Sequence, residues 1–128
     1  RYAVQVVKHD HRPRESTKFL GERQTAYEKK NWSSVMIFNN ERCSALSPSY
    51  VNQATGLELH QFKWLESEEM IGEIPGRWNH LVGYDTPSSD VSLVHYTLGG
   101  PYFSEYAQGE YSAEWNSERE AMLFAGRT

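Results

Sequence analysis

Short apolar runs separated by polar turns recur along the chain and predict β-strands. The run Val35–Phe38 is apolar without interruption, which predicts a strand that is buried on both faces. Residues 12–31 hold six of the 13 lysine and arginine residues and show little periodicity, so a long loop with a helical turn near Ser16–Leu20 is expected there. The expected strands cover residues 2–7, 32–38, 78–84 and 92–96.

Three other segments favour helices. Ser47 followed by Pro48 is typical of a helix start, with serine as the cap and proline at the first helical position, and this helix should stop at Gly56. An amphipathic helix is expected over residues 57–65 and another over residues 111–124. Gly72–Arg77 should form a loop. The expected packing residues of the last helix are Tyr111, Trp115, Met122 and Leu123.

Strands that alternate with helices in one small chain predict an α/β fold. With 128 residues, of which 38% are hydrophobic and 13% aromatic, positions 1–128 should form a single domain with a real core. The first residue is Arg1 and leads directly into a strand, so the chain is expected to be a fragment of a longer protein. The longest apolar run has four residues, far short of a membrane-spanning helix.

The net charge and the cysteine content argue against several classes of function. The formal net charge of −4 disfavours a strongly basic nucleic-acid surface, so no nucleic-acid partner is expected. The single cysteine, Cys43, excludes an internal disulfide framework and a cysteine-rich zinc site. No P-loop, dinucleotide-binding glycine motif, zinc-protease motif or serine-hydrolase motif is present.

His95 carries the strongest candidate chemistry. It ends an apolar strand and precedes Gly99 and Gly100, whose backbone N–H groups can approach an anion closely. This pattern suits a site that binds a metal ion or a phosphate group. The alternative is that His95 is a structural histidine whose ring is hydrogen-bonded.

Other candidates each have a structural alternative. His9-Asp10-His11 could bind a metal or form a solvated loop. The glutamates at positions 66, 68 and 69 could perform acid–base chemistry or form a solvated helix end. Trp64 and Trp78 could stack on a sugar or pack in the core.

Four motifs in order change this picture. They are Asn31–Asn39 (NWSSVMIFN), an acidic pair near Glu68, Ile74–Asn79 (IPGRWN) and Val94–Tyr102 (VHYTLGGPY). Together they resemble the second half of GT-A fold nucleotide-sugar glycosyltransferases, specifically glycosyltransferase family 8 and its bacterial relatives. That group contains glycogenin and lipopolysaccharide galactosyltransferases, with counterparts near FNSGVMLIN, DQ, LP..WN and H..G..KPW. The resemblance covers slightly more than half of the chain.

The resemblance implies the C-terminal portion of a GT-A fold, a mixed sheet with flanking helices. It further implies a divalent metal (Mn²⁺ or Mg²⁺) and a donor such as a UDP-hexose, with transfer of the hexose to a glycan or lipid-linked acceptor. The implied setting is the cytoplasm, including the inner face of the membrane. The implied site residues are His95 for the metal, Gly99 and Gly100 for the diphosphate, Trp32, Ser33 and Ser34 for the sugar, and Glu68 and Glu69 as the catalytic acidic pair.

The sequence also departs from that family. No DxD motif is present, and Gly100-Pro101-Tyr102 stands where the family has Lys-Pro-Trp. The nucleotide-binding half would therefore precede Arg1. Two other hypotheses stay open at this point: a non-catalytic sugar-binding module that uses Trp32, Trp64 or Trp78, and a homo-oligomeric assembly module that pairs through an exposed sheet edge.

Overall fold

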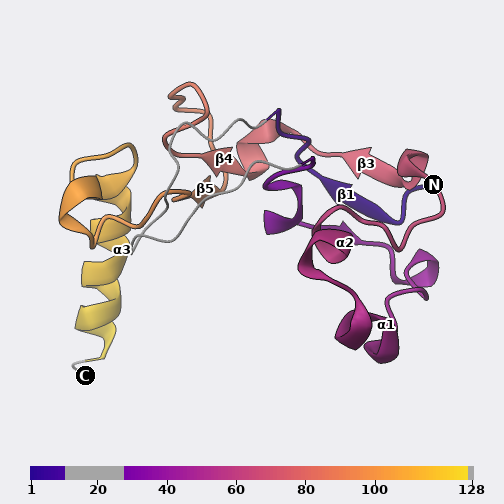
Figure 1. Cartoon of the computed structure of the whole chain (residues 1–128). Coiled ribbons are helices and arrows are strands. Elements are labelled where there is room, and N and C mark those ends of the chain that lie inside the picture. The colour runs from indigo at the N-terminus through magenta and orange to yellow at the C-terminus, as the bar shows by residue number, and fades with distance from the viewer. Residues whose placement is uncertain (11–27, 127–128) are drawn as a thin grey trace.

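A computed structural model describes residues 1–10 and 28–126 of the chain. In these ranges the protein is a small mixed α/β domain with a mixed sheet and three α-helices (Figure 1). The strands are β1 (Val4–Val6), β2 (Ile37–Phe38), β3 (Ile71–Glu73), β4 (His80–Leu81) and β5 (Val94–His95). The helices are α1 (Pro48–Gln53), α2 (Gly56–His60) and α3 (Ser112–Ala125).

The first sheet has the order β2-β1-β3, with β1 antiparallel to β2 and parallel to β3. Because β1 is the central strand, its apolar side chains Val4 and Val6 are fully buried. They pack with Phe62 and Trp64, which follow α2, and with Ile71 of β3. This cluster is the core of the N-terminal part of the domain.

A second sheet pairs β4 with β5 in parallel, with Leu81 opposite His95. In Figure 1 it lies between the three-stranded sheet and α3, which stands at the far end of the molecule from the N-terminus. The carboxyl end of β3 leads through a 3-10 turn at Gly76–Trp78 into β4. The two sheets therefore meet where β1 and β3 end.

The expected strand over residues 32–38 is confirmed only at its end. Trp32–Ser34 form a 3-10 turn, and β2 is limited to two residues. The prediction that this run is buried on both faces is wrong, because β2 is an edge strand and the Ile37 side chain is 54% exposed. Conversely, β3 falls in part on the expected loop Gly72–Arg77. Gly72 fits there because a Cβ atom would lie 2.5 Å from the Tyr2 ring.

The helix start at Ser47 is confirmed, since its Oγ accepts a hydrogen bond from the Tyr50 backbone at 3.1 Å. The helix ends at Gln53, before Gly56, because Thr55 caps the next helix in a capping box with Glu58. That next helix stops at His60, short of the expected Leu65, and Phe62 turns the chain with a left-handed φ of 58°.

The C-terminal helix is confirmed, but two of its expected packing residues are exposed. The Met122 side chain is 65% exposed, and Leu123 is exposed as well. The predicted helical turn at residues 16–20 lies outside the described residues. Across the described part of the chain, every helix is too short or too polar to cross a lipid bilayer.

Candidate functional site

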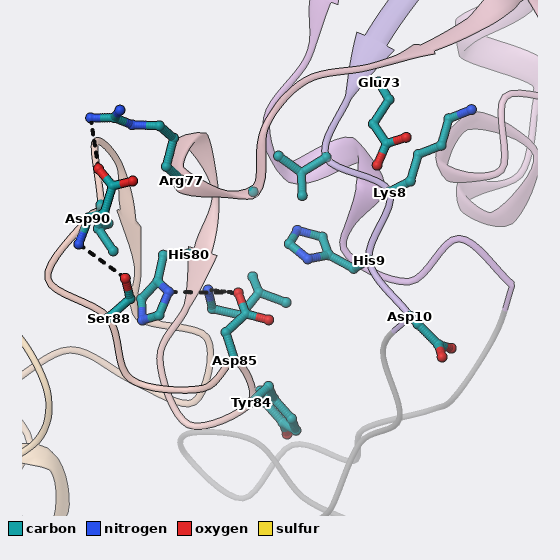
Figure 2. A pocket seen from close by; sticks show the side chains of 14 residues that line it. Lys8, His9, Asp10, Glu73, Arg77, His80, Tyr84, Asp85, Ser88 and Asp90 are labelled. Carbon is teal, nitrogen blue, oxygen red and sulfur yellow. Dashed lines mark hydrogen bonds and ion pairs between the residues drawn. The ribbon is translucent and has the colours of Figure 1, made fainter.

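A polar cavity of about 560 Å³ opens where the two sheets meet (Figure 2). Lys8, His9 and Asp10 enter it from the segment after β1, and Glu73 enters it from the end of β3. The opposite wall comes from β4 and the following turn. Side chains that can carry charge on that wall are Arg77, His80, Asp85 and Asp90. Residues with imidazole, carboxylate and cationic side chains thus line one space at the carboxyl ends of the parallel strands β1 and β3, a common place for ligand sites in α/β proteins.

His9, which lines this cavity, and His95, which lies at the end of β5, are both half-buried. His9 Nε2 and His95 Nδ1 are buried and find no hydrogen-bond partner among the described residues. Burial lowers the pKa of both imidazoles; for His9, Asp85 opposes this shift and His95 adds to it. Both rings are therefore held in the neutral form, which can bind a metal or accept a hydrogen bond.

Acidification should destabilise the fold through these two histidines. Because their folded-state pKa values lie below the usual value of about 6.5, the unfolded chain binds more protons as the pH falls through this range. Stability present above about pH 6.5 is then lost toward the folded-state pKa values. In chemical denaturation between about pH 7 and pH 5, the unfolding free energy of the wild type should fall more steeply than that of His95→Gln. Equal slopes would contradict this prediction.

Trp32, which is predicted to contact the sugar, contacts His9 and also lies near the Lys29–Glu68 ion pair. Trp32 Nε1 donates a hydrogen bond to the His9 carbonyl oxygen at 2.7 Å. The Lys8 and Lys29 ammonium groups each lie 5.9 Å from a Trp32 ring centroid. Lys29 also forms an ion pair with Glu68, and its hydrogen bond and charge lower the pKa of that carboxyl. Glu68 is thus an ionised group suited to positioning a ligand rather than to donating a proton.

Ser33 and Ser34 lie on the same 3-10 turn but contact different elements. Ser34 Oγ accepts a hydrogen bond from Asn79 Nδ2 at 2.7 Å and donates one to the Asn31 carbonyl at 2.6 Å. Ser33 Oγ lies 2.5 Å from His60 Nδ1. Because Asn79 is fully buried beside β4, Ser34 ties the turn to the second sheet.

Gly99 and Gly100 follow β5 and serve close packing. Gly99 has a left-handed φ of 156°, and a Cβ there would lie 2.7 Å from the Tyr106 ring. At Gly100, a Cβ would lie 2.4 Å from the Tyr102 ring. Gly99 also lines a second cavity of about 510 Å³. That cavity shares Tyr84 and Asp85 with the first, so the two cavities adjoin.

The remaining predicted residues lie apart from the polar cavity. Glu69 is exposed in a 3-10 turn, where its backbone N–H donates to Ser67 Oγ at 3.2 Å. His11 lies outside the described residues. Trp78 is exposed, whereas Trp64 belongs to the core, as the structural alternative for that residue predicts.

His80, which no sequence motif singles out, is buried between two carboxylates. His80 Nε2 donates to Glu110 Oε1 at 2.6 Å, and Nδ1 lies 3.9 Å from Asp85 Oδ2. Asp85 Oδ2 also accepts the Leu81 backbone N–H at 2.8 Å. No local motif could have revealed this cluster, because Glu110 is 30 residues away along the chain.

A metal or cofactor would find only part of its ligand set here. Across residues 1–10 and 28–126, no three histidine, cysteine, aspartate or glutamate side chains are arranged to hold a metal ion. The unpartnered nitrogen of His95 does fit one ligand position, because a neutral imidazole binds divalent cations. Further ligands would have to come from His9, from a bound substrate, or from residues beyond those described.

The chain is similar to Protein CDI of Arabidopsis thaliana, with 43% identity over an alignment of 127 residues. The alignment covers 94% of this chain and 49% of that protein. The chain thus spans about half the length of the curated relative it matches. No protein-family model matches the chain, and no solved structure matches it.

Proposed function

We propose that this chain is the C-terminal part of a nucleotide-sugar glycosyltransferase with a GT-A fold. The reaction is transfer of a hexose from a nucleotide-diphosphate donor, such as a UDP-hexose, to a glycan or lipid-linked acceptor. One observation carries the proposal: His95, the residue that the family resemblance assigns to the metal, has a buried ring nitrogen without a partner among the described residues. An ordinary structural histidine would have that nitrogen hydrogen-bonded.

The donor diphosphate needs positive charge and backbone N–H groups. A divalent metal would neutralise the leaving diphosphate when bound, and His95 is its proposed ligand. The turn at Gly99 and Gly100 is proposed to present backbone N–H groups to the same diphosphate. Lys8 lines the cavity, and it adds a cation on the wall formed by the segment after β1.

The sugar is proposed to lie near Trp32. The carboxylate of Glu68, fixed by Lys29, lies near this tryptophan and can accept hydrogen bonds from sugar hydroxyl groups. Ser33 and Ser34 add hydroxyl groups on the same turn. Positioning of donor and acceptor, rather than proton transfer, is the role that this arrangement supports.

From the resemblance, we propose that a nucleotide-binding half with the DxD motif precedes Arg1 in the whole protein. The length of the curated relative, about twice that of the matched region, is consistent with a longer protein. The unpaired Cys43 supports a reducing compartment, and the cytoplasm is the proposed location.

Thermal unfolding with UDP and Mn²⁺, added separately and together, tests the proposal. A ligand at about 100 times its dissociation constant stabilises a fold by about 2.7 kcal/mol, which is several degrees for a domain of this size. We expect UDP to raise the midpoint only when Mn²⁺ is present, and we expect His95→Gln to lose the shift. His60→Gln is the matched control, because His60 is exposed on α2 and should keep the shift.

A second candidate function is assembly through the sheet edge. Ile37 and Phe38 are exposed on β2, which has β1 as its single neighbour among the described strands. An exposed apolar edge strand can pair with another chain. In the thermal experiment this candidate predicts a midpoint that rises with protein concentration and does not respond to UDP and Mn²⁺.

A further inference from the structure

We propose that the polar cavity and the second cavity, which Gly99 lines, together bind one amphipathic ligand, a neutral glycoside. Its sugar lies in the polar cavity and its apolar group lies in the second cavity. In the proposed function this ligand is the acceptor, so its role rests on that function, whereas its binding does not. The lipid-linked class of acceptor is thereby preferred to a free glycan.

The first argument is that the two cavities share a wall. Tyr84 and Asp85 line both cavities, which have volumes of about 560 and 510 Å³. His80 lines the polar cavity, and its Nε2 donates a hydrogen bond at 2.6 Å to Glu110, which lines the second cavity. One small molecule that passes this wall can therefore occupy both cavities.

The second argument is that the two linings differ in chemistry. Apolar and aromatic side chains of the second cavity are Val82, Pro87, Tyr96, Leu98 and Tyr106. The Glu110 carboxylate beside them already accepts hydrogen bonds from His80 and from the Ser88 backbone N–H. The Tyr96 hydroxyl donates to the Tyr111 carbonyl oxygen at 2.8 Å. Because these polar groups are engaged within the protein, the second cavity suits an apolar group, whose burial there is favourable.

The third argument is that the polar cavity offers hydrogen-bond acceptors. The His80 side chain is 4% exposed, and because its Nε2–H donates to Glu110, the neutral ring keeps Nδ1 as an acceptor. His80 Nδ1 lies 3.9 Å from Asp85 Oδ2, which is too far for a direct hydrogen bond (Figure 2). The Glu73 carboxylate lines the same cavity, and no hydrogen bond or ion pair joins it to another described residue. A ligand with several donors satisfies these atoms, and sugar hydroxyl groups are such donors.

Charge favours a neutral ligand over an anionic one. The described lining of the polar cavity has four carboxylate side chains and two cationic ones. Arg77 is paired with Asp90 at 3.3 Å, and the Lys8 ammonium lies 5.9 Å from the Trp32 ring centroid. The excess of negative charge therefore disfavours a phosphate or carboxylate group in this cavity. A sugar brings hydroxyl donors without negative charge, and a cationic amphiphile is the alternative that the experiment separates.

Calorimetric titration of the whole chain with alkyl glucosides tests the proposal without an enzymatic assay. The probes are glucose, butyl β-D-glucoside and hexyl β-D-glucoside, below the concentrations at which micelles form, together with hexyl phosphate and hexyltrimethylammonium. Each buried methylene group strengthens binding about fourfold, so the hexyl glucoside should bind roughly 16-fold more tightly than the butyl glucoside. We expect weaker binding of glucose, of hexyl phosphate and of hexyltrimethylammonium than of hexyl glucoside.

Two variants assign the halves of the ligand to the two cavities. Glu73→Ala should weaken hexyl glucoside binding about tenfold, because a hydrogen bond to a charged acceptor is lost. Leu98→Ala should reduce the gain from butyl to hexyl and leave glucose binding unchanged. The matched controls are Glu118→Ala on α3 and Leu57→Ala on α2, both exposed and outside the two cavities. Thermal unfolding without ligand verifies that each variant is folded.

The possible results separate this inference from the proposed function. It is overturned if hexyl glucoside does not bind, if chain length has no effect, or if the control variants weaken binding as much as Glu73→Ala does. Binding of hexyltrimethylammonium at least as tight as that of hexyl glucoside overturns the neutral sugar. In each of these cases the stabilisation by UDP with Mn²⁺ still decides the proposed function by itself. If the glycoside binds as expected and UDP with Mn²⁺ has no effect, the binding site stands and its role as an acceptor site is overturned.

Discussion

Replacing Leu81 with alanine should lower the free energy of unfolding by about 2–5 kcal/mol. The Leu81 side chain is 1% exposed, and its removal would leave a cavity in addition to losing buried apolar surface. Leu81 also pairs with His95 across the parallel strands and lines the polar cavity. Urea denaturation followed by tryptophan fluorescence measures the effect.

Leu57→Ala is the matched control for Leu81. Leu57 lies on α2 with its side chain 51% exposed, so the same truncation there should change stability by no more than about 0.5 kcal/mol. Similar losses for the two variants would show that β4 is not a packed part of the domain. The polar cavity would then not lie against a packed second sheet.

Replacing His80 with leucine should destabilise the fold by about 2 kcal/mol, although leucine has a similar size. His80 is 4% exposed, and its ring donates to Glu110 and approaches Asp85. The leucine would leave Oε1 of the mostly buried Glu110 carboxylate without this donor, while Oε2 keeps the Ser88 backbone N–H at 3.1 Å. An incompletely satisfied charged group costs more than a neutral one. Thermal unfolding should show a midpoint lower by several degrees.

The control for this variant is His60→Leu. His60 is exposed and its hydrogen bond to Ser33 competes with water, so the substitution should have a small effect. If His80→Leu is no more destabilising than His60→Leu, the contact between His80 and Glu110 does not stabilise the loop that leads into α3.

Elements set by local sequence could be predicted. Ser47-Pro48 defines a helix start because the cap and the proline act within one turn, and the apolar run in β1 suits a central strand. The exposure of β2 could not be predicted, because an apolar run looks the same at the edge and at the centre of a sheet. Met122 and Leu123 on α3 are exposed for a similar reason: an apolar stripe predicts a helix but does not show whether another element packs against that stripe.

In the candidate site, too, residues in local motifs could be predicted, whereas contacts between distant segments could not. The order of motifs pointed to Trp32, Glu68 and His95, and the structure connects Trp32 to Glu68 through Lys29 and to His9 through a hydrogen bond. The contact between His80 and Glu110 depends on how the chain folds back over 30 residues, and no spacing rule reveals it. The roles of the connected residues in sugar transfer stay predictions.

The response of thermal unfolding to UDP and Mn²⁺ tests the central claim most directly, which is that His95 forms part of a nucleotide-sugar donor site. The account predicts that UDP raises the wild-type midpoint only in the presence of Mn²⁺ and that His95→Gln abolishes this rise. A wild-type midpoint that does not move with UDP and Mn²⁺ together would contradict it. So would an equal rise in the wild type and in His95→Gln.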